Sequence, residues 1–349
     1  MRTRVLPIIK RRDPIRALII DDTGIPKKGK HSVGVARQYC GQLGKQDNCQ
    51  VAVSLSAAND HASLPIAYRL YLPHEWADDP DRRALAGVPD DVVFQTKPQI
   101  ALDQLRAALA AGIEAEVALL DAGYGTDTGL RDGITEMGLA YVVGIQSSTS
   151  LWPPGVEPLP PKPWSGRGRP TSAIRRDAER QPISAKRLAL GLPKSAWRRV
   201  TWREGTNTKL ASRFAAVRVR PAHRDYHRST PRPEEWCLIE WPRDEPEPTK
   251  YFLSTLPANI SRRKLVNTAK LRWRIERDYQ DLKQELGLGH YEGRGWRGFH
   301  HHATLCIAAY GFLISEREAI PPSGPGRASF VKEPPLPGGF RPRGSPDQT

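Results

Sequence analysis

Two aspartates in this 349-residue sequence each follow a short apolar run. Asp21 ends the run ALIID, and Asp121 ends the run VALLD. Each run predicts a buried strand, and parallel strands that end in this way place their carboxylates at one edge of a sheet, where α/β folds build their sites. Carboxylate oxygens are ligands that hard divalent cations take. Without a third partner, aspartates that only cap the following turn or helix are the simpler explanation.

A third carboxylate lies on a predicted helix in the last third of the sequence. Arg272, Glu276, Tyr279 and Lys283 follow one another at spacings of four, three and four residues, which places them in one stripe on the helix. The glutamate therefore lies between two cations. Considered alone, a solvent-exposed row of salt bridges accounts for the stripe equally well.

The segments around these residues resemble a known family. Three stretches carry the resemblance: IDDTGIPKKGKHSVGVARQYCG, LLDAGYG and LRWRIERDYQDLKQELGLGHYEGRGWRGFHHHATLCIAAYGFL. They are similar to insertion-sequence transposases of the DDE class, in the group whose Glu lies within a Tyr-Arg-Glu-Lys signature. The resemblance covers roughly residues 16–314. It implies an α/β fold in which an RNase H-like mixed sheet is flanked by helices and interrupted by a β-rich basic insertion.

The resemblance selects the two catalytic aspartates. In the family the first Asp stands two residues before a Thr, which selects Asp21 over Asp22. The second Asp lies in an Asp-Ala-Gly-Tyr turn, which is the turn that begins at Asp121. Both residues are therefore expected to be catalytic.

The resemblance also selects the third carboxylate. The signature Glu follows an Arg by four residues and precedes a Lys by seven, which matches Arg272, Glu276 and Lys283. The signature Tyr falls three residues before the Arg, where this chain has Ala269. The contribution of that Tyr is therefore in doubt in this chain, whereas the carboxylates are all present.

The implied chemistry is metal-dependent phosphoryl transfer on DNA. Asp21, Asp121 and Glu276 are expected to hold Mg²⁺ or Mn²⁺, and two such ions about 4 Å apart stabilise both the attacking and the leaving oxygen. Water is the first nucleophile, which gives hydrolysis, and the freed DNA 3′-hydroxyl is the second, which gives strand transfer. The implied partners are transposon ends and target DNA, with a homo-oligomer assembled on the DNA.

The net charge points to the same partner. The chain carries a formal charge of +15, and residues 162–232 contain 19 Lys and Arg against 4 Asp and Glu, so this segment holds the whole excess. A field of that strength suits a polyphosphate, because each neutralised phosphate releases condensed counterions. A merely soluble basic surface is the alternative.

Further DNA contacts are expected close to the carboxylates. Lys27, Lys28 and Lys30 lie in the turn after the first aspartate, where they would meet the phosphate backbone together with Arg272 and Lys283. A solvated loop explains the three lysines nearly as well. The family also implies that an aromatic residue of the insertion holds a displaced base, and the sequence leaves three candidates open, namely Trp197, Trp202 and Trp236.

The histidines and cysteines are not expected to form metal sites or disulfides. His300, His301 and His302 are consecutive, so on a helix they point in different directions and cannot converge on one ion. The four cysteines, at positions 40, 49, 237 and 306, show no Cys-x-x-Cys spacing, which favours buried reduced thiols.

Four parts follow from the predicted elements. Residues 1–150 are the first part of the catalytic domain, 151–255 the β-rich basic insertion, 256–320 a helical part that carries Glu276, and 321–349 a disordered tail. In the first part, apolar runs predict strands and helical spacing predicts one helix. The strands are expected at 17–21, 48–56, 65–72, 115–121 and 140–145, the helix at 98–112, and later elements at 213–220, 236–241, 261–286 and 297–318.

The N-terminus and the location of the protein also follow from the sequence. A short basic arm leads into the first catalytic strand, so the N-terminal DNA-binding domain usual in the family is expected to be absent. Without a signal peptide or an apolar run of about 20 residues, we expect no membrane association and a cytoplasmic location, on the nucleoid when DNA is bound.

Two other functions remain open from the sequence. A nuclease on the same fold would cut DNA without joining it, and a strand-transfer assay separates the two. A decayed or domesticated copy would bind DNA without cutting it. The absent N-terminal domain and the unusual tail favour that interpretation, whereas the retained carboxylates, Arg272 and Lys283 oppose it.

Overall fold

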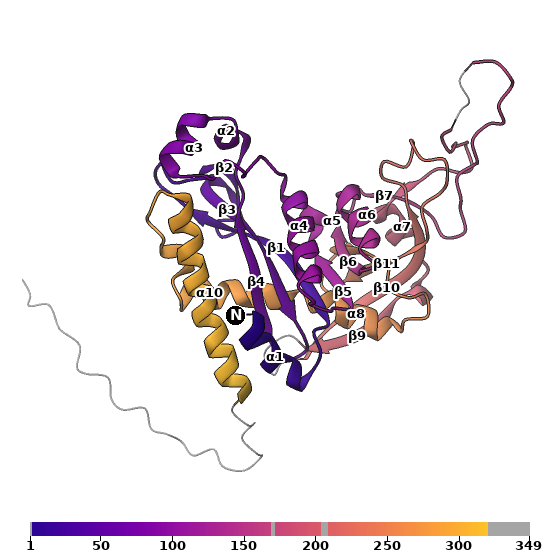
Figure 1. Ribbon diagram of the computed structural model, residues 1–349. Coiled ribbons are helices and arrows are strands. Elements are labelled where there is room, and N and C mark those ends of the chain that lie inside the picture. Colours follow the sequence, from indigo (N-terminus) through magenta and orange to yellow (C-terminus); the bar gives the residue numbers. More distant parts are fainter. Residues whose placement is uncertain (1, 169–171, 204–208, 320–349) are drawn as a thin grey trace, which may run out of the picture.

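A large mixed β-sheet forms the centre of the protein (Figure 1). The computed structural model describes residues 2–168, 172–203 and 209–319. Twelve strands of these residues join in one sheet with the order β2-β3-β1-β5-β6-β12-β11-β10-β7-β8, while β4 pairs with β3 and β9 with β10. The strands are β1 Ala17–Pro26, β2 Ala36–Cys40, β3 Lys45–Ala58, β4 Ser63–Leu70, β5 Val117–Leu120, β6 Ala140–Ile145, β7 Ser150–Trp152, β8 Ile183–Ser184, β9 Arg198–Arg203, β10 Lys209–Pro221, β11 Glu235–Trp241 and β12 Lys250–Ser254.

Strand direction divides the sheet at β1. The strands β4, β3 and β1 are antiparallel neighbours, whereas β5 is parallel to β1 and β6 is parallel to β5. Helices flank this mixed sheet, so the predicted fold class is confirmed. The helices are α1 Arg2–Arg12, α2 His74–Ala77, α3 Pro80–Ala86, α4 Lys97–Ala110, α5 Ala122–Gly125, α6 Thr128–Glu136, α7 Ala185–Gly191, α8 Arg262–Lys270, α9 Trp273–Gln284 and α10 Trp296–Ala319.

Successive side chains of β1 point to opposite faces of the sheet, and a different layer of helices covers each face. Leu18 and Ile20 are buried in a core cluster that includes residues of α4 and α6. Ala17 and Ile19 are buried in a second cluster with residues of α8 and with Ile275 of α9. Because successive strand residues point to opposite faces, odd-numbered positions of β1 face the α8–α9 layer and even-numbered positions face α4.

The strands of the predicted insertion continue the same sheet. β12 pairs antiparallel with β6, β11 pairs with β12, and β10 pairs with β11. Figure 1 shows them on the side of the sheet away from α10, with the connection between β7 and β8 extending outward. The boundaries 1–150, 151–255 and 256–320 stay a prediction, and the predicted disordered tail, 321–349, lies outside the described residues.

Several elements differ from the sequence-based expectation. β1 does not end at Asp21, because β3 pairs with it residue by residue as far as Pro26. A short strand, β2, was missed. The N-terminal arm is a helix, α1, which buries Val5, Leu6 and Ile9 and packs against α10.

The single helix expected at 261–286 is two helices, and this correction bears on the site. The amide of Leu271 donates to the carbonyls of both Asn267 and Thr268, and the amide of Arg274 donates to the carbonyl of Leu271 at 3.2 Å. Such i to i+3 bonds tighten a helix into a 3₁₀-like turn. Leu271 is buried in the core cluster of the α8–α9 layer, so burial of this side chain fixes the turn. The turn separates α8 from α9 immediately before Glu276.

Candidate active site

Strand register brings the two aspartates together. β1 and β5 pair in parallel, and their last pair is Ile19 with Leu119. Asp21 and Asp121 therefore each lie two residues further along adjacent strands, which in a sheet run about 4.8 Å apart. Asp121 is the N-cap of α5 and accepts hydrogen bonds from the amides of Gly123 at 2.9 Å and Tyr124 at 3.2 Å. The predicted capping function of this aspartate is thus present together with its position at the sheet edge.

Glycine at two positions lets the turn after Asp121 pack directly on β6. A Cβ atom on Gly125 would lie 1.9 Å from the carbonyl oxygen of Gly144, and a Cβ on Gly144 would lie 2.7 Å from the amide nitrogen of Ala122. Neither contact is sterically possible, so both residues must lack a side chain. The AGYG turn is therefore held close to the strand, which fixes where the Asp121 carboxylate lies.

Arg272 joins the sheet to the third carboxylate. Its guanidinium donates to Asp21 Oδ2 at 2.7 Å and also to Glu276 Oε1 on the next turn of α9. Asp21 is largely but not fully buried, with 15% of its side chain exposed, whereas 59% of the Glu276 side chain is exposed. The structure therefore brings Asp21 and Glu276 to the same guanidinium, and the stripe predicted on the helix does face the sheet.

The pKa of Asp21 is raised, and neighbouring negative charges are part of the cause. Burial raises the pKa of Asp21 to about 7, Arg272 opposes this rise, and the charges of Asp121 and Asp22 add to it. Burial alone would lower the pKa of Arg272, but Asp21, Glu276 and Asp121 outweigh that effect and raise it. All three predicted carboxylates therefore lie within electrostatic reach of one guanidinium.

The neighbouring Asp22 faces the other side of the sheet. Its carboxylate accepts from Lys97 Nζ of α4 at 2.7 Å and from the Tyr124 hydroxyl at 3.4 Å. This is the direction that alternation along β1 requires of an even-numbered residue. Asp21 and Asp22 are thus distinguished by face, and only Asp21 contacts Arg272.

Tyr279 of α9 lies beside Asp21, on the side of the neighbouring strand β3. Its hydroxyl lies 2.7 Å from Ser54 Oγ, and Ser54 is the residue of β3 that pairs with Asp21. Burial raises the pKa of Tyr279 well above its ordinary value, and the negative charge of Asp21 adds to this rise. The hydroxyl is therefore protonated at neutral pH and closes the strand side of the cluster.

The five predicted DNA-contacting cations separate into two groups. Lys28 and Lys30 are exposed. Lys27 donates to the carbonyl of Tyr291, and Lys283 donates to the carbonyl of Gly24 at 2.9 Å and to Gln42 Oε1 at 3.2 Å. Burial lowers the pKa of both of these lysines. Lys27 and Lys283 therefore join the end of β1 and the turn after it to the C-terminal helical part, Arg272 joins the carboxylates, and Lys28 and Lys30 face solvent.

Comparison with known proteins identifies the family. Residues 1–209, more than half of the chain, match the DDE superfamily endonucleases. The chain belongs to this family. It is also similar to the probable transposase for insertion sequence element IS701 of Microchaete diplosiphon, with 32% identity over 145 residues. That stretch is 41% of this chain and 35% of the relative, so the chain matches about a third of the relative's length.

The family is one of endonucleases, a class that generally uses divalent metal ions. The family match includes Asp21 and Asp121 but ends before α8. Glu276 and Arg272 therefore depend on the geometry described above and on the sequence resemblance. Among the described residues, no group of three or more His, Cys, Asp or Glu side chains is placed so that it could hold a metal ion.

Sequence reasoning missed one buried acidic residue of α9. Asp278 of α9 is fully buried and accepts from the hydroxyls of Ser56 at 2.9 Å, Ser63 at 2.6 Å and Tyr310 at 3.0 Å. Burial raises its pKa to about 6, and the three donors oppose that rise. These bonds anchor α9 to β3, β4 and α10. The signal was an aspartate on the apolar side of the helical pattern, three residues after Ile275.

The histidine tract and the tryptophans of the insertion have structural contacts. His300 accepts from the amide of Leu70, and His302 Nε2 lies 3.0 Å from the carbonyl of Gly287, so the histidines do not converge. The three candidate tryptophans are engaged as well. Trp202 packs on Phe214, Trp197 packs on Trp241, and Trp236 donates to the carbonyl of Pro257.

The described part of the chain also shows the state of its cysteines and the character of its helices. Its four cysteines are free and buried, which agrees with the expectation of reduced thiols. No helix within the described ranges combines the length and the apolar character that crossing a membrane requires.

Proposed function

We propose that this chain is the catalytic core of a DDE transposase, which hydrolyses DNA at the ends of an insertion sequence. The freed 3′-hydroxyl then attacks a phosphodiester of target DNA, which joins the two DNAs and releases a target 3′-hydroxyl. The observation that carries the proposal is the Arg272 bridge. One guanidinium contacts Asp21 of the sheet and Glu276 of α9, and the charge of Asp121 reaches the same group. Similarity to a probable insertion-sequence transposase supports joining as well as cutting.

The donor chemistry of this cluster fits a divalent metal ion. Asp21, Asp121 and Glu276 offer hard oxygen ligands, which Mg²⁺ and Mn²⁺ prefer. Burial is the main cause of the raised pKa of Asp21, and the negative charges of Asp121 and Asp22 add to it, so a bound cation would offset that repulsion. Mg²⁺ is usually held by one or two carboxylates and several waters, so a complete cage of protein ligands is not required. We propose that two ions bind here, through Asp21, Asp121 and Glu276.

When bound, such ions activate the attacking oxygen and stabilise the leaving oxygen of an in-line phosphoryl displacement. The residues of the chain position the participants. Tyr279 and Ser54 keep the strand side of Asp21 closed, and the amides of α5 hold the Asp121 carboxylate at the sheet edge. Glu276 is the most exposed member of the cluster, so its side chain is free to turn toward DNA.

Exposed cations and aromatics supply the surface for the DNA. Lys28 and Lys30 are exposed on the turn that follows β1. Trp164 and Tyr226, in the basic segment 162–232, are 59% and 57% exposed. We propose that these two residues, and not Trp197, Trp202 or Trp236, stack on displaced bases, because Trp202 is buried and the other two are partly buried. We also propose that the protein assembles as a homo-oligomer on the DNA.

A cleavage assay with the element's own end DNA tests this function. The labelled duplex is incubated with the protein and Mg²⁺, with Mn²⁺, or with chelator, and the products are then offered unlabelled target DNA. We expect nicked ends and joined products with either metal and neither product with chelator. Cutting without joining would identify a nuclease on the same fold, and binding without cutting would identify an inactive copy.

A further inference from the structure

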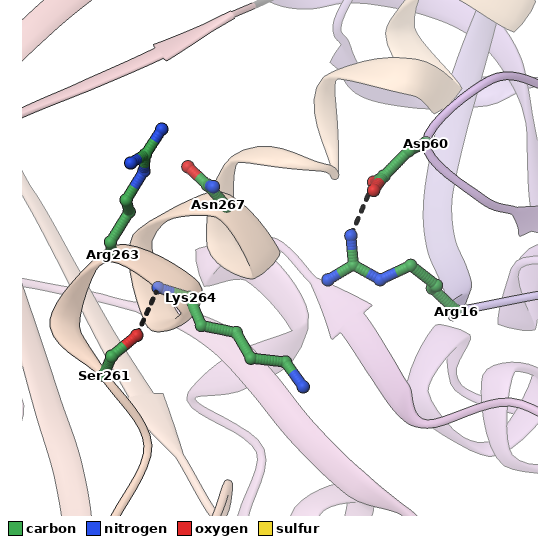
Figure 2. A pocket seen from close by; sticks show the side chains of 6 residues that line it. All are labelled: Arg16, Asp60, Ser261, Arg263, Lys264 and Asn267. Atoms are coloured by element: carbon green, nitrogen blue, oxygen red, sulfur yellow. Dashed lines mark hydrogen bonds and ion pairs between the residues drawn. The ribbon is translucent and has the colours of Figure 1, made fainter.

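An open pocket lined by cations lies at the end of β1 remote from Asp21 (Figure 2). Its volume is about 430 Å³. One wall comes from the segment before β1 and the turn between β3 and β4, and the other wall is the beginning of α8. The lining residues are Arg16 and Asp60 on the first wall and Ser261, Arg263, Lys264 and Asn267 on the second.

The charges around this pocket are unbalanced. Among the lining residues Asp60 is the only acid, and Arg16 pairs with it at 2.5 Å. Arg263 and Lys264 are exposed on the opposite wall, as Figure 2 shows. Burial lowers the pKa of the adjacent Arg262, and the charge of Arg198 lowers it further. Positive charge is therefore concentrated at this wall in excess of what Asp60 neutralises.

The sequence of α8 conflicts with its own helix dipole. The helix begins with three cations, Arg262, Arg263 and Lys264, and has no acidic residue in its first turn. The N-terminal end of a helix carries partial positive charge, so cations there are unfavourable and an anion is favourable. A local conflict of this kind between sequence and structure is typical of a functional position. An anion bound in the pocket would resolve it, because it would neutralise both the side chains and the dipole.

We infer that this pocket binds a backbone phosphate of duplex DNA at a distance from the carboxylate cluster. The inference rests on the proposed function. The lining contains no aromatic or large apolar side chain, so it offers nothing to a base, whereas its cations match a phosphate. Only the phosphate oxygens of the DNA contact the pocket. Contacts of this kind fix the position of the DNA on the protein but do not recognise its base sequence.

The position of the pocket gives the spacing between the two contacts. Arg16 lies five residues before Asp21, which corresponds to about 17 Å along an extended strand. Ser261 lies eleven residues before Arg272, which corresponds to about 16 Å along a helix. Both paths agree, and at about 3.4 Å per base pair they equal about five base pairs. For a duplex that runs along β1, the bound phosphate would lie about five base pairs from the phosphate that is cut.

Salt dependence of DNA binding tests the pocket. The full-length Arg263→Ala/Lys264→Ala variant is compared with wild type by fluorescence anisotropy on a 30-base-pair duplex over a range of NaCl concentrations. Each phosphate contact contributes about 0.9 to the slope of log K against log salt, so we expect the slope to fall by about 1 to 2. The matched control, Arg106→Ala/Arg297→Ala, also removes two exposed cations, from α4 and α10, and is expected to keep the wild-type slope.

Single methylphosphonate substitutions locate the contact on the DNA. A neutral linkage about five base pairs from the cut should weaken wild-type binding by about fivefold at 0.15 M salt and should not weaken the variant further. The melting temperature without DNA provides a second measurement, because removing cations from the start of α8 should raise it. Should the double variant fail to fold, Lys264→Gln serves in both assays.

The possible outcomes separate this inference from the proposed function. An unchanged slope in the variant, with wild-type binding and cutting intact, overturns the pocket and leaves the function standing. A wild-type protein that binds no duplex at all overturns both. A reduced slope together with loss of sensitivity at one phosphate supports the pocket, even in a variant that still cuts.

Discussion

Arg272 donates to Asp21 at 2.7 Å, although 251 residues separate them in the sequence. The same guanidinium contacts Glu276, four residues along α9. A buried carboxylate of raised pKa and an exposed carboxylate therefore share one cation. Arg272 therefore holds the carboxylate of the sheet and the carboxylate of α9 together.

Removal of any one carboxylate should stop cutting. We expect Asp21→Asn, Asp121→Asn and Glu276→Gln each to lower the cleavage rate by at least about 1000-fold, since a metal ion contributes several kcal/mol to the transition state. DNA affinity should change little, because it depends on exposed cations elsewhere. The control is Asp22→Asn, which alters a neighbouring carboxylate on the opposite face. Cutting retained by Glu276→Gln would exclude that residue from the site.

Stability should depend on pH through Asp21. Its pKa is raised to about 7 from the ordinary value of 3.8, so the stability that the group contributes is complete below about pH 4 and is lost as pH rises through about 7. We expect wild type to lose up to about 4 kcal/mol relative to Asp21→Asn between pH 4 and pH 8. Urea unfolding of both proteins at several pH values measures this difference. Parallel stability curves would contradict the raised pKa.

Loss of Arg272 should destabilise the protein most above neutral pH. Arg272→Met removes the cation that opposes the rise in the pKa of Asp21, so the ionised carboxylate remains buried without its partner. Removing one partner of a buried pair typically costs about 3–5 kcal/mol, and near pH 5 the cost should be smaller because Asp21 can be protonated. Chemical denaturation at pH 5 and pH 8 tests this. Arg277→Met, on the exposed side of α9, is the control.

Loss of Asp278 should destabilise the protein without direct involvement in chemistry. Asp278→Ala leaves the hydroxyls of Ser56, Ser63 and Tyr310 buried without their acceptor. We expect a loss of about 2–4 kcal/mol in the free energy of unfolding, because each unsatisfied buried group costs about 1–3 kcal/mol and some will find new partners. At a temperature where the variant is folded, DNA affinity should remain near that of wild type. A loss below about 0.5 kcal/mol would show that the network contributes nothing.

DNA binding should depend on the charge of the basic segment 162–232. Deleting the segment is unsuitable as a test, because β10 within it pairs with β11 of the main sheet. Replacing the exposed cations Lys162, Arg167 and Arg187 by Gln removes charge and leaves the strands intact. The salt slope should fall by about 0.9 for each phosphate that the variant no longer neutralises. A salt slope equal to that of wild type would show that the main DNA-binding surface lies in another part of the molecule.

The sequence by itself determined the local elements and the identity of the acidic residues. Most strands of the first 150 residues lie within a few positions of their prediction, and β6 matches it at both ends, because apolar runs bounded by turn residues specify buried strands. Asp21 and Asp121 stood out as the first polar residues after such runs. The stripe of Arg272 and Glu276 followed from helical spacing alone, since that spacing is a local property.

Only the tertiary structure decided which groups meet. Pairing with β3 carries β1 past Asp21, and the buried Leu271 turn divides the predicted helix, because both depend on partners distant in the sequence. The same holds for Asp278, whose donors come from β3, β4 and α10, and for the pocket, whose walls are 200 residues or more apart in sequence. Local spacing fixes the direction of a side chain from its own strand or helix. The burial of a side chain and the balance of charge around it depend on all the residues that pack against it. Those neighbours come together only in the folded chain.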